Sequence, residues 1–396
     1  MKRVWLKKGR EKSVKIRHPW VFSGAVKRIE GSPEPGDTVM VVDHDSEFLS
    51  YAQYSPLSQI ALRNIEYDYN KITDDAFWAE RTDAALEQRK ILYKEYDTDS
   101  VRLIFGEGDS MPGLIADMYG SCIVIQALSA GAEKAKNIVA ARLNESLKPD
   151  FIYERGDSEM RKLEGLPEVS GALYGQAKRY IVIRENSLSF NVDIEAGHKT
   201  GYYLDQKLNR RLIRKYCEGK DVLDCFSYTG SFSVNSLFAG ADKVTRLESS
   251  ADALDSGRKN INLNRLDFEK DEPIDGDVFM TLRKFRDQGR SFGVVILDPP
   301  KFAPAKRNLQ AAWAAYKDIN LLAMKLLAPG GILITFSCSG NISQEEFQNV
   351  LAWAATDAGR NVTILERLYQ SPDHPVTLSF PEALYLKGFI CRVDPL

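Results

Sequence analysis

The second half of the chain alternates short β-branched runs with longer segments of helical periodicity. The runs are DVLDCFS (221–227), KVTRLES (243–249), EPIDGDV (272–278), FGVVILDPP (292–300), GGILITFSC (330–338), NVTILERL (361–368) and LYLKGFICRV (384–393). Strands that alternate with helices are typical of βαβ units. The sequence therefore predicts an α/β domain with a mostly parallel, doubly wound, seven-stranded sheet, whose ligands bind beyond the carboxyl ends of the strands.

Two regions of different texture precede this domain, which we place at residues 196–396. Residues 1–72 hold short strand-like runs separated by turn signals such as GSPEPGD, which predict a small β-rich domain. Residues 73–195 begin with a helix-favouring linker and continue with strands around one amphipathic segment, KAKNIVAARLNESL. This middle region is predicted to be an α+β domain.

Basic residues are concentrated at the start of the chain, although the overall net charge is only −2. They are Lys2, Arg3, Lys7, Lys8, Arg10, Lys12, Lys15, Arg17 and His18, and Trp5, Trp20 and Phe22 lie among or just after them. Cations beside aromatic rings suit RNA, which is bound through its backbone and by base stacking. The alternative, which we weight equally, is that the basic residues form an ordinary solvated surface and the aromatic residues belong to the core.

The spacing of the cysteines and the distribution of apolar residues argue against a disulfide-bonded, secreted or membrane-spanning protein. The five cysteines are widely spaced and form no CxxC pair or Cys/His cluster, so we expect no disulfides and no metal site. The N-terminus has no apolar segment of signal-peptide length, and no apolar run is long enough to span a membrane. We expect a soluble, cytoplasmic protein with no membrane partner.

Polar side chains follow the first five predicted strands. The loop after the first strand, DCFSYTG, carries bulky Phe226 and Tyr228 where a dinucleotide-binding enzyme would have glycines, so a nicotinamide oxidoreductase is disfavoured. A ligand with an adenine or sulfonium and no phosphate fits better. Glu248 ends the second strand, where an acidic residue accepts hydrogen bonds from a ribose diol. Asp275, Asp277, Asp298 and Cys338 follow the next strands. Each acidic residue alone could be a helix cap.

Seven motifs together resemble the bacterial 23S ribosomal RNA cytosine-C5 methyltransferase I family: HPWVFSGAV, GHKTGYYLDQ, CFSYTG, DPPKF, YKDIN, TFSCSG and LYLKGF. The resemblance extends from Lys8 to Val393. It implies a PUA domain, an α+β middle domain and a Rossmann-like class I methyltransferase domain. It also implies S-adenosyl-L-methionine (AdoMet) as cofactor, 5-methylcytosine as product, and protein-free or partly assembled 23S ribosomal RNA as partner, and it allows a homodimer.

The resemblance and the strand ends give two sets of binding residues. For AdoMet these are Gln206, Asp224, Phe226, Ser227, Tyr228, Gly230, Glu248, Ser249, Asp277, Asp298 and Pro299, with Gln206 at the amino-acid end of the cofactor. For RNA they are Lys199, Arg211, Pro300 and Lys301. Arg210 is a further candidate for contact with RNA phosphate beside Arg211, and an ordinary amphipathic helix with a basic outer face is the alternative for both.

Two residues are expected to be catalytic. Cytosine C5 is too weak a nucleophile to take a methyl group directly, so the thiolate of Cys338 must first add to C6. Cys338 as inert core filler, or Cys225 as the nucleophile, are the alternatives. Asp298 is expected to hold or protonate N3 of the base, unless it only caps the following segment. His374 and Glu382 are candidates for removing the C5 proton, although each is more typical of a structural role.

Two other functions remain open on the sequence. An RNA methyltransferase acting on an exocyclic nitrogen of guanine or adenine would also carry a D/N-PP turn, but normally with an aromatic residue directly after it and with no need for cysteine. Lys301 stands at that position here. A non-catalytic RNA-binding protein on an AdoMet fold would not need Asp224, Glu248, Asp298 and Cys338 together.

Overall fold

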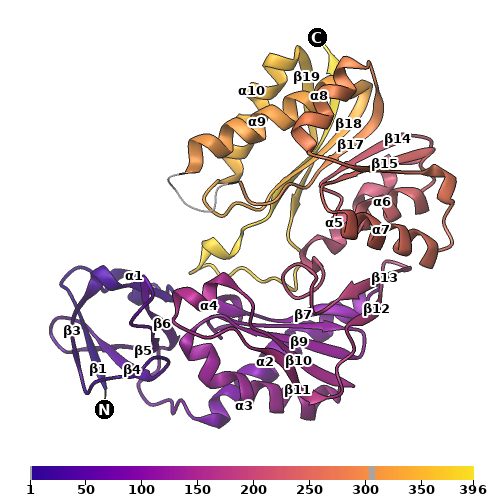
Figure 1. Ribbon diagram of the computed structural model, residues 1–396. Coiled ribbons are helices and arrows are strands. Elements are labelled where there is room, and N and C mark those ends of the chain that lie inside the picture. Colours follow the sequence, from indigo (N-terminus) through magenta and orange to yellow (C-terminus); the bar gives the residue numbers. More distant parts are fainter. Residues whose placement is uncertain (1, 303–307) are drawn as a thin grey trace. The chain divides into compact units, whose positions relative to one another are not determined.

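The computed structural model describes residues 2–302 and 308–396, and Figure 1 shows their helices and strands. The chain forms two compact units. The first comprises residues 1–185, 192–204 and 372–383, and the second comprises residues 186–191, 205–371 and 384–396. Because the units divide the chain differently from the domain boundaries expected at residues 72 and 195, those boundaries stay predictions.

The first unit opens with a six-stranded sheet in the order β2-β6-β5-β4-β1-β3. Its strands are β1 (Arg3–Leu6), β2 (Trp20–Phe22), β3 (Val26–Glu30), β4 (Thr38–Val42), β5 (Phe48–Tyr54) and β6 (Ile60–Glu66). One short helix, α1 (Lys12–Lys15), follows β1. Alternate residues of these strands bury a core that includes Val4, Leu6 and Val41, as expected for half-buried strands. The β-rich N-terminal domain predicted from turn spacing is confirmed.

The rest of the first unit is built on a five-stranded sheet in the order β11-β10-β9-β8-β7. The strands are β7 (Ser100–Phe105), β8 (Leu114–Tyr119), β9 (Cys122–Ala127), β10 (Phe151–Arg155) and β11 (Ser170–Gly175). The helices are α2 (Asp75–Glu95), α3 (Ala130–Leu147) and the short α4 (Glu159–Leu163). Asp74 and Ser129 cap the first two helices by accepting from the backbone N–H of Phe77 and Ala132.

The two sheets of the first unit share one hydrophobic core. Trp5, Met40 and Ile65 of the N-terminal sheet belong to the same buried cluster as Leu103 and Val139 of the middle region. Residues 372–383 also fold with this unit, because Asp373 accepts a hydrogen bond from the backbone N–H of Arg102 at 2.9 Å. A hairpin of β12 (Tyr180–Glu185) and β13 (Leu188–Asp193) lies in sequence where the chain passes between the units.

The second unit is a seven-stranded sheet in the order β16-β15-β14-β17-β18-β20-β19. The strands are β14 (Asp221–Cys225), β15 (Lys243–Glu248), β16 (Asp271–Asp275), β17 (Phe292–Leu297), β18 (Leu327–Ser337), β19 (Arg360–Tyr369) and β20 (Lys387–Pro395). The first five run parallel and the last two pair antiparallel. All seven predicted runs form strands, and the predicted mostly parallel sheet of a class I methyltransferase fold is confirmed.

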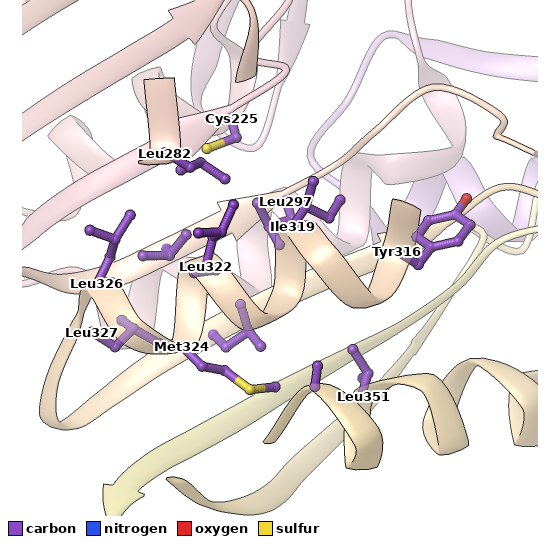
Figure 2. Packing of buried hydrophobic residues seen from close by; sticks show 14 of the residues in the cluster. Cys225, Leu282, Leu297, Tyr316, Ile319, Leu322, Met324, Leu326, Leu327 and Leu351 are labelled. Carbon is purple, nitrogen blue, oxygen red and sulfur yellow. The ribbon is translucent and has the colours of Figure 1, made fainter. Parts of the chain in front are cut away.

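Helices cover both faces of this sheet (Figure 1). They are α5 (Lys207–Ile213), α6 (Ser231–Phe238), α7 (Ala251–Leu263), α8 (Val278–Asp287), α9 (Leu309–Leu326) and α10 (Gln344–Ala358). The core beneath α8, α9 and α10 contains Leu282, Ile319 and Leu351, which Figure 2 shows around α9. Within the described ranges, no helix combines the length and the apolar character needed to cross a bilayer.

Candidate active site

The site lies where the strand order reverses, between β14 and β17. Cys225 pairs with Leu297 at the carboxyl ends of these parallel strands, and the backbone N–H of Asp298 points to the carbonyl of Cys225 at 3.5 Å. The loop after β14 and the DPP turn after β17 are therefore neighbours. Such a reversal opens a crevice beyond the strand ends in α/β sheets.

The loop after β14 has an unusual backbone. Phe226 and Tyr228 have φ angles of 60° and 48°, in the left-handed region that residues with side chains rarely adopt. Gly230, with φ of 72°, begins α6, and an added Cβ would lie 3.3 Å from both Arg246 Cδ and Gly257 Cα. Glu248, at the end of β15, restrains the backbone of this loop, since Tyr228 N donates to Glu248 Oε2 at 3.0 Å. Strain of this kind persists where a site requires it.

Three buried side-chain oxygens at the end of β14 and in the loop after it have no hydrogen-bond partner within the described part of the chain: Asp224 Oδ1, Ser227 Oγ and Thr229 Oγ1. The other oxygen of Asp224 accepts from Ser233 Oγ at 2.6 Å. Burial raises the pKa of Asp224 to about 7, against the opposing effects of Ser233 and Arg246. Buried polar atoms normally have partners, so this cluster fits a polar ligand at the end of β14.

Glu248 and Asp277 both accept backbone hydrogen bonds. Glu248 Oε1 accepts from Ser249 N at 2.8 Å and Ser250 N at 3.1 Å, while its other oxygen holds Tyr228. A carboxylate can accept about four hydrogen bonds, so a ribose hydroxyl could still be accommodated. Asp277 Oδ1 accepts from Met280 N at 2.8 Å and caps α8. The helix-cap alternative therefore describes the geometry of Asp277.

Asp298 is oriented by a chain of amides. Gln206 Nε2 donates to Asp298 Oδ2 at 3.1 Å, and Gln206 Oε1 accepts from Asn209 Nδ2 at 2.6 Å. Asn209 also donates to the Tyr369 carbonyl at 3.0 Å. Gln206 is buried and Asp298 is half-buried. The sequence indicated Gln206 but not Asn209, whose spacing of three residues on the same helical turn was the available signal.

Cys338 differs from the other four cysteines, and the described ranges contain all five. It is partly exposed just beyond the end of β18, and its Sγ lies 3.8 Å from the Pro299 carbonyl oxygen. The others are buried, which raises the pKa of Cys122 and Cys391 to about 12 and that of Cys217 to about 11. Burial also raises the pKa of Cys225 well above its usual value.

Cys225 is a packing residue in this structure. Figure 2 shows it among the apolar side chains of the core, near Leu282, and it belongs to the same buried cluster as Leu297. A thiol that is fully buried and disfavoured as thiolate is a poor nucleophile. The structure therefore favours Cys338 over Cys225 as the reactive thiol.

Two residues that no sequence argument had singled out surround the Cys338 loop. Tyr316 on α9 accepts from Ser337 Oγ at 3.1 Å, and its hydroxyl lies 3.3 Å from Ser339 Oγ. Lys387 at the start of β20 donates from Nζ to the carbonyls of Ser339 at 2.7 Å and Ile342 at 2.5 Å. Tyr316 and Lys387 lie in the motifs YKDIN and LYLKGF, which were the available signal.

The predicted RNA-contacting residues are distributed over both units. Pro300, Lys301 and Arg211 are exposed in the second unit, whereas Arg210 beside them is only 1% exposed and cannot face RNA. Lys199 is exposed in the first unit, where its Nζ lies 4.6 Å from the ring centre of Tyr203.

His374 and Glu382, the candidates for removing the C5 proton, both belong to the first unit. His374 is 3% exposed and its Nδ1 lies 3.1 Å from Asp373 Oδ1. Glu382 Oε1 lies 3.4 Å from His18 Nε2. His374 is therefore packed in the interior of the first unit, whereas Glu382 is exposed, and their part in removing the C5 proton stays a prediction.

Comparison with known proteins identifies the family. Residues 166–389 match the S-adenosylmethionine-dependent methyltransferase family, and residues 4–67 match a PUA-like domain. The chain is 48% identical over 392 residues to the ribosomal RNA large subunit methyltransferase I of Cronobacter sakazakii, covering 99% of both proteins. The chain belongs to the ribosomal RNA large subunit methyltransferase I family. The Klebsiella pneumoniae relative is also 48% identical, over 393 residues, covering 99% of this chain and 98% of that protein.

Solved structures support the fold of this ribosomal RNA large subunit methyltransferase I family member. A SAM-dependent methyltransferase from Streptococcus mutans aligns over 99% of this chain and 100% of its own, with a TM-score of 0.85 and 22% identity. A methyltransferase crystallised with SAH aligns over the same shares with a TM-score of 0.87 and 22% identity. AdoMet is the cofactor of the matched family, and the unpartnered oxygens of the loop after β14 fit a polar ligand there.

Proposed function

We propose that this protein methylates carbon 5 of a cytosine in the 23S RNA of the large ribosomal subunit, with Cys338 as covalent nucleophile. One observation carries the proposal: Cys338 is the only partly exposed cysteine of the five, all of which the structure describes, and it lies beside the DPP turn. The names of the curated relatives support ribosomal RNA as the substrate.

The thiol is needed because cytosine C5 is too weakly nucleophilic to take a methyl group directly, whereas C6 is electron-poor and open to attack by a thiolate. Cys338 loses its proton to solvent, and the resulting thiolate adds to C6, which turns C5 into an enamine carbon. When bound, AdoMet would supply its sulfonium methyl group to C5, with S-adenosylhomocysteine as the other product. Loss of the C5 proton to a base then returns electrons to the C5–C6 bond and expels Cys338. Methyl transfer thus consumes one AdoMet and regenerates the thiol.

Asp298 and its neighbours would hold the base. The two prolines after Asp298 restrict the turn, Gln206 fixes one carboxylate oxygen, and we assign the carboxylate to N3 or the amino group of cytosine. Holding the base so that C6 faces the Cys338 sulfur is worth several kcal/mol in favourable cases. Cytosine must leave its stack to enter such a site.

The loop after β14 would hold AdoMet. Asp224, Ser227 and the backbone around Gly230 offer the polar contacts, Phe226 and Tyr228 would enclose the adenosine, and Glu248 stands where a ribose would reach. Gln206, beside Asp298, would contact the amino-acid end. Asp277 and Ser249 would support the site indirectly, because their side chains engage α8 and Glu248.

The PUA-like domain offers a groove for an RNA base. Arg10, His18, Trp20 and Phe22 line a hollow of about 340 Å³, and Phe22 is 53% exposed. The exposed cations Arg3, Lys7, Lys8, Lys12, Lys15 and Arg17 belong to the same domain. Aromatic rings that stack bases beside cations that meet phosphates are the usual elements of RNA binding. Trp5, by contrast, is 4% exposed and serves the core.

Methylation of an exocyclic nitrogen agrees less well with the residues that follow the DPP turn. Such enzymes stack the base on an aromatic side chain just after the D/N-PP turn, but Lys301 occupies that position and is exposed. Phe302 follows, and its ring packs against Tyr316 with 4.8 Å between centroids and against Phe279 with 5.9 Å. The nearest aromatic is therefore occupied by packing, which favours the cysteine-dependent reaction.

A trapping experiment tests the proposal. Wild-type protein, AdoMet and 23S ribosomal RNA containing 5-fluorocytosine should give a methylated covalent adduct, because fluorine cannot leave as the C5 proton does. Peptide mass spectrometry should locate the link at Cys338. The Cys338→Ala variant should form no adduct, and Cys225→Ala should still form it. An adduct on Cys225, or C5 methylation by Cys338→Ala at a comparable rate, would contradict the mechanism.

A further inference from the structure

Lys387 is a buried cation behind the Cys338 loop. It pairs with Ser337 in the antiparallel register of β18 and β20, one residue before the cysteine. Its side chain is buried, with the residue only 4% exposed, and Nζ donates to the carbonyls of Ser339 and Ile342. These two bonds span the loop that carries Cys338.

The charge of Lys387 has no salt bridge among the described side chains. Its ammonium donates to two neutral carbonyl oxygens, those of Ser339 and Ile342. Burial lowers the pKa of Lys387 to about 8, while Cys338 and Glu346 act in the opposite direction and Lys301 acts in the same direction as burial. A cation buried without a counter-ion is costly, and perturbed groups of this kind gather at functional sites.

We propose that Lys387 is a positioning residue that fixes the Cys338 loop and whose positive charge stabilises the Cys338 thiolate. The inference rests on the proposed role of Cys338 as nucleophile. Lys387 keeps its proton throughout: the thiol proton leaves to solvent, and the ammonium acts through space on the remaining negative sulfur. No direct Lys387–Cys338 hydrogen bond is required.

Several other charged or titratable groups lie around Cys338, and each affects how stable a thiolate is at that position. Asp298 and Tyr316 lie close enough to interact electrostatically with each other, and Tyr316 also interacts with Cys338. Burial raises the pKa of Tyr316 to about 12, so its hydroxyl stays neutral in the working range. The Asp298 carboxylate opposes a second negative charge nearby. Lys301 is exposed, and solvent weakens its effect. Glu346 is engaged in the capping box of α10 with Ser343.

Alkylation of the thiol measures this effect without methyl transfer. In full-length wild-type protein, the rate of iodoacetamide reaction at Cys338, followed by peptide mass spectrometry, should rise with pH around a midpoint below the ~8.5 of a free thiol. A midpoint at or above that value overturns the proposal, whatever the variants do.

Substitutions of Lys387 distinguish the effect of its positive charge from the effect of its hydrogen bonds. Lys387→Met and Lys387→Gln should move the midpoint upward by about one pH unit, which lowers the alkylation rate near pH 7 about tenfold. Lys387→Arg should keep the midpoint near that of wild type. The matched control is Lys325→Met, an exposed lysine on α9. Unshifted midpoints in folded Lys387→Met and Lys387→Gln would also overturn the proposal.

Methylation rates complete the test. Lys387→Gln should lose kcat, with the AdoMet KM little changed, and should recover part of it as pH rises, which a purely structural defect would not do. No recovery at high pH in a folded variant counts against the charge role. The proposed function fails separately: if Cys338→Ala still methylates cytosine, Cys338 is not the nucleophile, while the alkylation result for Lys387 stands as measured.

Discussion

Gln206 donates a hydrogen bond of 3.1 Å to Asp298 although the two residues lie 92 positions apart in the sequence. The bond joins the segment before α5 to the DPP turn after β17. It fixes the direction of the Oδ2 carboxylate oxygen of Asp298. The orientation of the base in the proposed reaction therefore depends on a residue that needs no contact with the base.

Replacing Gln206 should impair catalysis through Asp298. We expect Gln206→Met to lower kcat by about 10- to 100-fold, because small misplacements of a positioning group have effects of this size. Steady-state methylation of 23S RNA measures kcat. Calorimetric titration with AdoMet shows how much of the lost activity comes from weaker cofactor binding. Gln288→Met, at the end of α8, is the control. A Gln206→Met enzyme with wild-type kcat would show that the bond is dispensable.

Removal of the Cys338 sulfur should abolish methylation without unfolding the protein. Cys338 is at a partly exposed loop position, so Cys338→Ala should change the free energy of unfolding by less than about 1 kcal/mol. Cys225→Ala removes a fully buried group and should cost more, about 1 to 2 kcal/mol, while the activity remains. Urea unfolding and a methylation assay on the same samples compare the two. Loss of activity in the Cys225 variant alone would reverse the assignment.

Asp224 should make the cofactor-free protein less stable as pH rises. Its folded pKa of about 7 exceeds the ordinary value of 3.8, so the folded state binds more protons between these values and stability falls as pH increases through that window. Asp224→Asn should remove this slope and raise stability at pH 8 by about 2 to 4 kcal/mol. Melting temperatures from pH 5 to 8 measure the slope, with the exposed Asp252→Asn as control. An unchanged slope would mean that Asp224 is ionised in the folded protein.

Glu248 should contribute to AdoMet binding. We expect Glu248→Ala to weaken it by about 1 to 3 kcal/mol, both through a lost acceptor for the ribose and through a loosened Tyr228 backbone. Glu248→Gln keeps an acceptor and should lose less. Calorimetric titration with AdoMet, and with NADH as a ligand expected not to bind, is the measurement. Heat from NADH and none from AdoMet would contradict the cofactor assignment for this site.

RNA affinity should depend on the groove of the PUA-like domain. Phe22→Ala should weaken binding of 23S RNA fragments by about 1 to 3 kcal/mol, the usual value for one stacked base. Lys8→Ala should reduce the dependence of binding on salt by roughly one counterion. Point variants are preferable to deleting residues 1–70, because Trp5, Met40 and Ile65 share a core with the rest of the unit. The control is Leu57→Ala, which truncates another exposed apolar residue. Equal losses of RNA affinity in Phe22→Ala and Leu57→Ala would argue against RNA binding in the groove.

The strand ends were predictable because parallel strands bring their carboxyl ends to one edge. Asp224, Glu248, Asp298 and Cys338 follow from locating four strands, without knowledge of any side-chain contact. The role of Asp277 was not separable from a helix cap by sequence alone, since both need an acidic residue after a strand and before a helix. The structure supplies the capping bond and leaves its cofactor role a proposal.

Tyr316 and Lys387 could not be assigned from pattern. Each lies within a regular element, where a tyrosine or lysine is ordinarily a core or surface residue. Their contacts with the Cys338 loop appear only when β18, β20 and α9 are packed together. The merging of the N-terminal sheet with the middle region was missed for a similar reason, because a shared core between two sheets leaves no local periodicity.

The placement of residues 372–383 in the first unit has a consequence for biosynthesis. Arg89 donates to the Asp373 carbonyl across 284 positions, and the Asp373 carboxylate holds the backbone of Arg102 across 271. A nascent chain leaving the ribosome exposes its N-terminal segments first, yet these contacts cannot form until translation is nearly complete. The first unit, which contains the PUA-like domain, therefore cannot complete these contacts before most of the second unit has been synthesised.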